Sequence, residues 1–368
     1  MLFIKDYLSK NKMKIIIILL IIIIVIFRFL NYQRDNKKTG SLTNDVNIKM
    51  NPINKLSTDN YQSDVFSMKK PSNWKIEAAG SGIYYAIRVY DPNDDRNQIF
   101  LMLKIQPLLK SYAAKKSWSN YSALNGNNSQ YKLFADAVVL DDPTTYGFYK
   151  KFNEVSSYVK VYGDMAGLNF PTINEFTKLE EFESNASMKS VAMDSKVLRA
   201  TYKNQNDNVA EGLFSASIVN LGNQNQNGVD MLYYMVYDIM FVSSAKDEFI
   251  NYKDILLECV NSINFTDEYV KKTIDDSNYQ TKKSLEINAS IQKSFDSYMS
   301  AWENRNKTYD IMSQKQSDAT LGYERVYDTD TGDIYKAYNG FSDDYKGDKF
   351  KSVTDDMYIS KVYGYIEK

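Results

Sequence analysis

Residues 231–242 read MLYYMVYDIMFV, and this stretch decides the fold. Every residue in it except Asp238 is apolar or aromatic, so both faces of an extended chain would be hydrophobic here. A strand with two hydrophobic faces is typical of the centre of a sheet that is covered on both sides. The sequence therefore predicts a central strand over 229–243, with packing layers above and below it.

Alternating apolar residues predict further strands around this one. The runs at 82–91 and 98–105 alternate in this way, and the segment 92–97 (PNDDRN) between them indicates a hairpin with a long loop. Other extended segments are expected at 65–68, 74–76, 196–202 and 211–221.

Helices are expected over 111–124, 145–162 and 246–264. In the last of these, Phe249, Leu256 and neighbouring apolar residues fall on one stripe. Strands that bracket helices in this order predict an α+β domain over 61–265, with a mostly antiparallel sheet flanked by helices.

The segment 266–321 contains no glycine or proline, which allows one long helix or two stacked helices. Apolar residues recur in its second half at intervals of four and three, with Asn288 and Arg305 as lapses. Two interpretations stay open: this seam packs against the chain's own sheet, or it joins two copies of the chain. The seam comprises Ile291, Phe295, Tyr298, Trp302, Tyr309 and Met312, and self-association would use the first four.

The remaining residues, 322–368, form a small tyrosine-rich unit. Strands are expected at 323–327 and 334–338, joined by a turn at 328–333 (DTDTGD). The tyrosines could recognise a sugar or a peptide at the surface, or they could supply the core of this unit.

A short hydrophobic run lies near the N-terminus. Residues 15–27 (IIIILLIIIIVIF) are flanked by Lys14 and Arg28. At about 1.5 Å per residue the run reaches about 20 Å, less than the ~30 Å hydrocarbon core of a bilayer. It spans the bilayer if the flanking cations reach the interface and the segment extends over 13–30.

Bulky and charged residues follow the run, with no small-residue cleavage site and no cysteine for a lipid, so we expect an uncleaved signal-anchor. It would make a single pass through the cell membrane, preceded by a short flank (1–12) and followed by a flexible tether (31–60). Basic residues are balanced on its two sides. The free N-terminal amine and the short leading segment favour an N-terminus inside the cell and a folded body outside.

Composition excludes several kinds of chemistry. The chain has no histidine among its 368 residues and one cysteine, Cys259, so catalytic triads, His-ligated zinc and disulfides cannot come from its own residues. The 45 basic and 46 acidic residues leave no basic excess that would favour nucleic acid. Cys259 falls beside the apolar stripe of its helix and is expected to be a buried, inert thiol.

Acidic clusters were considered as metal sites. Asp328-x-Asp330-x-Gly332 lacks the ligand spacing of a calcium-binding EF-hand and is better explained as a hairpin turn. The acidic group in 91–95 (DPNDD) is interpreted as a solvated turn. No metal, cofactor or catalytic residue is assigned. The Ser-x-x-Lys matches at 67–70 and 290–293 and the Lys-Thr-Gly at 38–40 are interpreted as chance.

Asp238 interrupts the most apolar strand. A buried carboxylate must be paired or protonated, so a Lys or Arg partner is expected. Asp230 would lie on the same face, which leaves open a pair of catalytic carboxylates.

Two sets of residues resemble known proteins. Phe66-Ser67-Met68 followed by 71–76 (PSNWKI), and the closing 256–265 (LLECVNSINF), resemble the opening and the close of PsbP-like domains. The stretches 91–100 (DPNDDRNQIF), 211–216 (EGLFSA) and 313–332 (SQKQSDATLGYERVYDTDTG) resemble an uncharacterised family of exported, membrane-attached proteins of Gram-positive bacteria. The resemblance implies an extracytoplasmic fold of a kind that binds or assembles proteins, without a shared active site. Many relatives would be lipid-anchored through a cysteine that this chain lacks.

Two functions follow as hypotheses. The first is a non-catalytic, membrane-anchored binding or assembly protein of the cell envelope, in contact with the bilayer through 13–30. The second is a cell-wall glycan-binding protein, or a hydrolase that uses Asp230 and Asp238.

Overall fold

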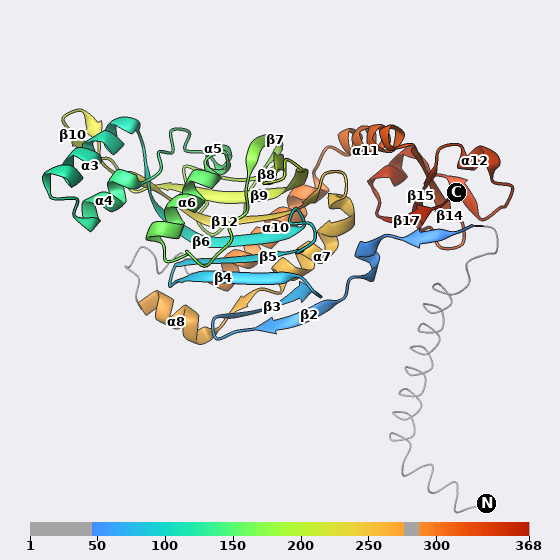
Figure 1. The fold of residues 1–368 in the computed structure, drawn as a ribbon, viewed down its shortest axis with the longest axis horizontal. Coiled ribbons are helices and arrows are strands. Elements are labelled where there is room, and N and C mark those ends of the chain that lie inside the picture. The colour runs from blue at the N-terminus through green and yellow to red at the C-terminus, as the bar shows by residue number, and fades with distance from the viewer. Residues whose placement is uncertain (1–45, 276–286, 368) are drawn as a thin grey trace, which may run out of the picture. The chain divides into compact units, whose positions relative to one another are not determined.

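The computed structural model of the protein describes residues 46–275 and 287–367 (Figure 1). They form two compact units. The larger unit consists of 52–321 and 353–362, and the smaller unit contains the described residues before 52, from 322 to 352 and after 362. The predicted flank (1–12), the signal-anchor (13–30) and the first part of the tether lie outside the described residues. Of the helices in the described ranges, none is long and apolar enough to cross a membrane.

The larger unit is built on a seven-stranded antiparallel sheet (Figure 1). The protein is therefore a mixed α+β structure with antiparallel sheets, as the sequence predicts. The central strand predicted over 229–243 is present from Tyr233 to Ala245 and lies three strands from each edge, whereas 229–230 belong to a separate two-stranded sheet. In spatial order the strands are β4 (Lys75–Ser81), β5 (Tyr84–Tyr90), β6 (Gln98–Leu109), β12 (Tyr233–Ala245), β9 (Val209–Asn220), β8 (Asp194–Lys203) and β7 (Asn174–Glu183).

One face of this sheet is covered by α5 (Thr145–Lys150) and α6 (Phe152–Tyr162). Phe241 of β12 lies at the centre of this core, stacked between Phe214 and Phe100 at ring-centroid distances of 5.0 and 5.4 Å. At one end of the sheet lie α3 (Tyr112–Leu124), α4 (Ser129–Asp136) and the short hairpin of β10 (Asn225–Gln226) and β11 (Val229–Asp230) (Figure 1).

The opposite face is covered by α7 (Phe249–Asn261) and α10 (Ile287–Glu303), which bury Leu256 and Tyr298 against Met240 of β12. A three-stranded sheet completes this layer. It consists of β13 (Asn264–Phe265), β3 (Phe66–Pro71) and β2 (Thr58–Gln62), and α8 (Asp267–Asp275) follows β13. The two extended segments predicted around the turn at 70–73 therefore belong to different sheets.

The segment 266–321 is not one long helix. The structure describes α8, α10 and α11 (Lys307–Leu321), and α10 and α11 are separated at 304–306. The Asn306 side chain accepts a hydrogen bond from the backbone N of Tyr309 (3.1 Å), which caps the first turn of α11. A capping residue can start a new helix without glycine or proline, so their absence did not guarantee continuity.

The apolar seam of α10 packs against the chain's own sheet. Ile291, Tyr298 and Trp302 are buried there, so the first of the two interpretations of the seam describes this structure. The two lapses in the seam are structural contacts: Asn288 bonds to the backbone of Phe265 through both ends of its amide (2.8 and 3.1 Å), and the Arg305 guanidinium lies over the Trp302 ring at 3.8 Å.

A buried ionic network connects α11 to the sheet. Asp310 lies between Arg199 of β8 (2.5 Å) and Arg305 (2.7 Å), and Arg199 also contacts Glu211 of β9 (2.6 Å). Burial by itself would lower the pKa of Arg199, but the charges of Glu211 and Asp310 outweigh it and raise that pKa. Arg199 therefore stays charged and fully paired.

The smaller unit is a five-stranded sheet in the order β1 (Ile48–Met50), β17 (Val362–Ile366), β15 (Ile334–Tyr338), β14 (Tyr323–Asp328) and β16 (Phe350–Ser352), with the short helix α12 (Phe341–Asp344). The predicted hairpin of β14 and β15 is confirmed.

The predicted tether is too long at its C-terminal end. Its last residues contain β1, a 3-10 helix (η1, Pro52–Lys55) and β2. β1 pairs with β17 through the backbone, and an edge strand of this kind needs no apolar period in its sequence.

The core around Phe241 gives a test of the central-strand argument. We expect Phe241→Ala to lower the free energy of unfolding by about 3–5 kcal/mol, because it removes a ring packed between two others inside the sheet core. Met312→Ala, at a side chain with 67% exposure, should change it by less than about 0.5 kcal/mol. Denaturant titration measures both values, and similar effects of the two variants would contradict the placement of β12 at the centre.

Candidate binding cleft

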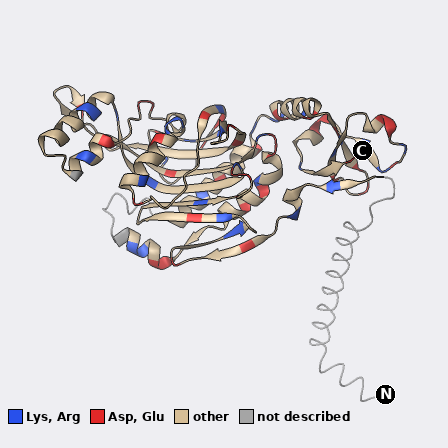
Figure 2. Cartoon of the chain, viewed as in Figure 1, with Lys and Arg blue, Asp and Glu red and all other residues tan. Residues whose placement is uncertain are grey.

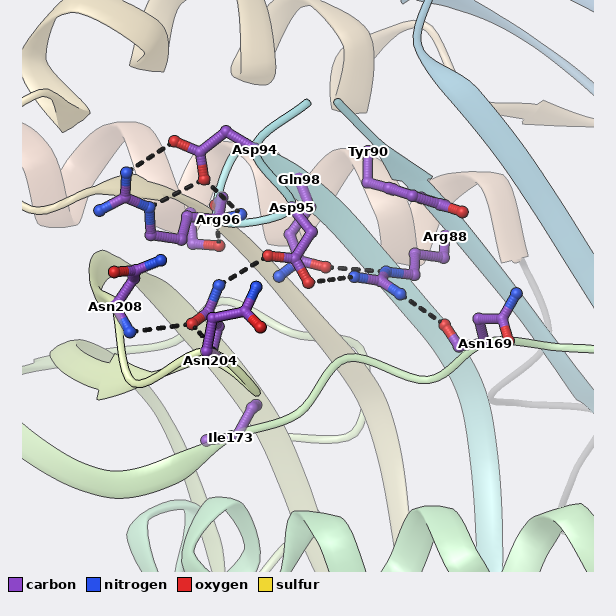
Figure 3. A network of polar contacts seen from close by, with 12 residues as sticks. Arg88, Tyr90, Asp94, Asp95, Arg96, Gln98, Asn169, Ile173, Asn204 and Asn208 are labelled. Carbon is purple, nitrogen blue, oxygen red and sulfur yellow. Dashed lines mark hydrogen bonds and ion pairs between the residues drawn. The ribbon is translucent and has the colours of Figure 1, made fainter. Parts of the chain in front are cut away.

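Polar side chains surround a cleft of about 590 Å³ at one end of the large sheet. Its walls are the loop between β5 and β6 (91–97), the turn between β8 and β9 (204–208) and the segment that follows α6. Figure 3 shows the network of polar contacts at its base. We call it the polar cleft.

Arg88 of β5 forms the base of the polar cleft. It is 5% exposed, and its guanidinium donates to Gln98 Oε1 (2.9 Å) and to the backbone oxygen of Asn169 (2.8 Å) (Figure 3). It lies 3.7 Å from Asp95 and over the ring of Tyr90 at 4.3 Å. Burial lowers the pKa of Arg88 and the charge of Asp95 opposes this effect. The charge of Arg88 is thus compensated within the protein.

The acidic residues of the 91–97 loop have separate partners. Asp94 makes two hydrogen bonds with the Arg96 guanidinium (2.8 and 2.7 Å), and Asp95 accepts one from Asn204 Nδ2 (2.7 Å). Asp91 accepts one from the backbone N of Asn93 (2.9 Å). The three carboxylates do not converge, and the described part of the chain holds no group of three His, Cys, Asp or Glu side chains that could bind a metal ion.

The turn at 204–208 is fixed from within by Asn204. Its Oδ1 accepts hydrogen bonds from the backbone N of Asn206 and of Asn208 (both 3.0 Å), while its Nδ2 reaches across to Asp95. Asn204 is buried, whereas Gln205, Asn206 and Asn208 are exposed and line the cleft. The side-chain amide of Asn204 therefore fixes the backbone of Asn206 and of Asn208.

The polar cleft offers hydrogen-bonding groups and two aromatic rings. The exposed amides, together with Asn169 and the hydroxyl of Thr172, supply donors and acceptors. Tyr90 supplies a ring face, and the largely buried ring of Phe170 also lines the cleft. Such a surface suits a ligand with many hydroxyl or amide groups. No motif in the sequence marks these residues, although a lone Arg within the apolar run at 82–91 is a signal of a buried cation that needs partners.

The two carboxylates that could have formed a catalytic pair belong to different networks. Asp230 contacts Lys110 Nζ (2.7 Å) and accepts from the backbone N of Gln224 (2.9 Å) and Leu232 (3.1 Å). Partial burial opposes ionisation, but these contacts outweigh it and lower the pKa of Asp230. None of these partners contacts Asp238.

Asp238 has no basic partner among the described residues, contrary to expectation. It lies in an irregularity of β12 with a φ of +52°, and its carboxylate accepts hydrogen bonds from Ser290, from Ser217 Oγ (3.1 Å) and from the backbone N of Met188 (3.3 Å). Burial raises its pKa, and the three hydrogen bonds and the charge of Lys293 only partly offset this. The Ser290 match to Ser-x-x-Lys thus has a structural role.

The other candidates are structural. Cys259 is fully buried and burial raises the pKa of its thiol to about 12, which makes it inert. Asp328 accepts from the backbone N of Asp330 (2.9 Å) and Gly332 has a φ of +78°, as in a hairpin turn. All the tyrosines of the tail are buried or half-buried.

Comparisons with known proteins do not assign a function. The sequence matches none of the models of known protein families, and no curated protein is similar enough to count as a relative. In Figure 2, basic and acidic residues are interspersed along the same strands and helices. The features of the larger unit that bear on function are therefore the polar cleft and a second cavity.

The raised pKa of Asp238 predicts how stability depends on pH. An acid whose pKa is higher in the folded state binds its proton more tightly there, so the folded state loses stability as the pH rises from the ordinary value of 3.8 through the raised one. Asp238→Asn removes this loss. It also keeps the geometry, because the two bonds to Oδ2 remain and the new amide faces the Ser290 hydroxyl. We expect a higher Tm than wild type at pH 7, and a difference that shrinks towards pH 4.

Asp230→Asn is the matched control with the opposite sign. The pKa of Asp230 is lowered in the folded state, so its stabilising contribution is present above the unfolded pKa and this variant should lose Tm at pH 7. A Tm of Asp238→Asn at or below that of wild type at pH 7 would contradict the environment described for Asp238.

Proposed function

We propose that this chain is a non-catalytic, membrane-anchored binding protein whose folded part lies outside the cytoplasm, and that the polar cleft binds an uncharged, hydroxyl-rich ligand of the cell-wall glycan class. One observation carries the proposal. The charged groups at the base of the cleft, Arg88, Asp94, Asp95 and Arg96, already have partners within the protein. Lys160, an exposed residue of the cleft wall, is the exception: its Nζ lies 5.9 Å from the Phe170 ring centroid and forms no described ion pair. The cleft therefore presents mainly amides and rings.

An uncharged ligand gains most from such a site. Sugar hydroxyls and acetamido groups can donate to and accept from the exposed Asn and Gln amides, while a sugar ring can pack on Tyr90. A strongly anionic ligand would have to break the pairs at Asp94 and Asp95 to reach a guanidinium. The existing ion pairs and hydrogen bonds of the cleft's charged residues therefore favour an uncharged ligand.

Two sequence features support the proposed location. The run 15–27 has the composition of a signal-anchor and no cleavage site follows it. The antiparallel sheet with helices on both faces is compatible with the proposed PsbP-like domain. The resemblance to exported proteins of Gram-positive bacteria points to the same compartment.

The hydrolase alternative has less support. Glycosidases that use two carboxylates hold them about 5–10 Å apart in one cleft. Asp230 is bonded to Lys110, and Asp238 is bonded to hydroxyl groups of other elements. Neither residue lines the polar cleft.

Glycan binding is testable with variants of the turn at 204–208. Asn206 and Asn208 are exposed in the cleft, and we expect Asn206→Ala/Asn208→Ala to weaken binding of an N-acetylglucosamine tetramer by about tenfold or more, as each lost amide removes hydrogen bonds to the ligand. Calorimetry on the full chain and co-sedimentation with insoluble peptidoglycan measure this.

The control is Asn261→Ala/Asn264→Ala, which removes two exposed amides outside the cleft and should leave binding unchanged. The proposal fails if neither the tetramer nor peptidoglycan binds the wild-type chain, or if the cleft variant binds as well as the control.

The location has its own test. With a tag at the C-terminus, protease added to intact cells should remove the tag while a cytoplasmic marker stays intact, because the folded body would lie outside the membrane. A tag that becomes sensitive only after lysis would place the body inside. The mass of the recovered protein reports whether 1–30 are retained.

A further inference from the structure

A second cavity of the larger unit differs from the polar cleft in chemistry. It has a volume of about 340 Å³ and shares no lining residue with the polar cleft. Its walls are mainly aromatic and apolar side chains from β5, β12, α4 and α6, among them Tyr84, Tyr233, Phe134 and Tyr158. We call it the aromatic cavity.

Lys104 of β6 lines the aromatic cavity and is 5% exposed. Its Nζ lies 5.0 Å from the centroid of the Tyr237 ring and 5.7 Å from that of Tyr84. Among the described residues no carboxylate lies within ion-pair distance of it. Two ring faces are thus the main electrostatic partners that the structure gives to this ammonium group.

Lys110, the residue that directly follows β6, shows what the fold provides for another lysine. Its side chain is 9% exposed, and its Nζ contacts the Asp230 carboxylate (2.7 Å) and Asn223 Oδ1 (2.9 Å). A buried cation is expensive unless it is paired and hydrogen-bonded. Of these two lysines, Lys110 at the end of β6 has a counter-ion among the described residues and Lys104 within β6 has none, and Lys104 lines a cavity.

The tyrosines around Lys104 do not supply a negative charge near neutral pH. Burial raises the pKa of Tyr84 and of Tyr237 to about 12, and raises those of Tyr233 and Tyr158 as well. Tyr162, whose pKa is raised to about 12 by burial and its bond to Asp136, also lines the cavity. Asp164 is an exposed lining residue that forms no described ion pair with Lys104. Burial lowers the pKa of Lys104 to about 8.

We propose that the aromatic cavity is a second binding site, for a small aromatic or aliphatic carboxylate whose acid group pairs with Lys104 and whose apolar part lies among Tyr84, Phe134 and Tyr233. The ligand would supply the counter-ion that the chain lacks at this position. The volume lies near the lower end of the range for small-molecule sites and suits a ligand of this size. This site is independent of the glycan-binding cleft and takes a ligand of another class.

The test uses the full-length chain with benzoate and octanoate as probes, measured by calorimetry. We expect both to bind, and Lys104→Met to weaken them by about tenfold or more, because it removes the cation and keeps the length of the side chain. Met in place of a buried, unpaired cation should not lower the Tm, so a loss of binding can be separated from misfolding. Lys160→Met, in the polar cleft, is the control and should bind benzoate like wild type.

The pH dependence separates charge pairing from plain apolar burial. A bound carboxylate favours the ammonium form, so near pH 8 binding should take up a proton, seen as a heat that depends on the ionisation enthalpy of the buffer. Affinity should also fall as the pH rises from 8 to 10. Benzamide, which is neutral and of similar shape, should bind more weakly than benzoate.

Equal affinities for benzoate and benzamide would overturn the proposal, as would full affinity in Lys104→Met. Absence of benzoate and octanoate binding to the wild-type chain would also overturn it. The two proposals can fail separately, because the two sites share no lining residue. The Asn206→Ala/Asn208→Ala variant, which tests glycan binding, should therefore bind benzoate like wild type.

Discussion

The rest of the larger unit depends on the need to cover both faces of β12. Phe241 packs into one core and Met240 into the other, so a helical layer is required on each side of the strand. β12 also separates the β5–β6 hairpin from the β8–β9 hairpin, and both hairpins turn at the same end of the antiparallel sheet. The walls of the polar cleft are those two turns. The spacing of the cleft is therefore set by the width of the two strands, β12 and β9, that lie between β6 and β8.

Elements with strong apolar patterns could be predicted from the sequence, and others could not. The central strand, the hairpin over 82–105 and the β14–β15 hairpin agree with expectation, because in each the apolar pattern or the turn residues report burial directly. β7 was missed because its sequence NEFTKLEEFE is that of a charged edge strand with little buried surface. The sequence left one long helix or two stacked helices open over 266–321, because the break between α10 and α11 is made by an asparagine cap and not by glycine or proline.

The sites were harder to predict because their contacts join residues that are distant in the sequence. Asn204 meets Asp95 from 109 positions away, and Ser290 meets Asp238 from 52 positions away. Asp238 was correctly singled out as an unusual carboxylate, but the sequence could not show that hydroxyl groups would replace the expected cation. Lys104 occupies a polar position in an alternating strand, which normally indicates solvent. In this fold the Lys104 side chain lies beside Tyr84 and Tyr237, in a cavity that is also lined by aromatic residues of α4 and α6.

The smaller unit has a consequence for the order in which the protein folds. Its first strand, β1, pairs with its last, β17, and the side chain of Asn47 donates to Glu367, 320 positions later (2.9 Å). At about 5–20 residues per second, a ribosome needs roughly 15–60 s to synthesise the chain between them. Residues 52–321 leave the ribosome during that interval and can complete most of their own sheet first. β1 is thus synthesised long before the strand that it pairs with, and the sheet of the smaller unit closes only after β17 has been made.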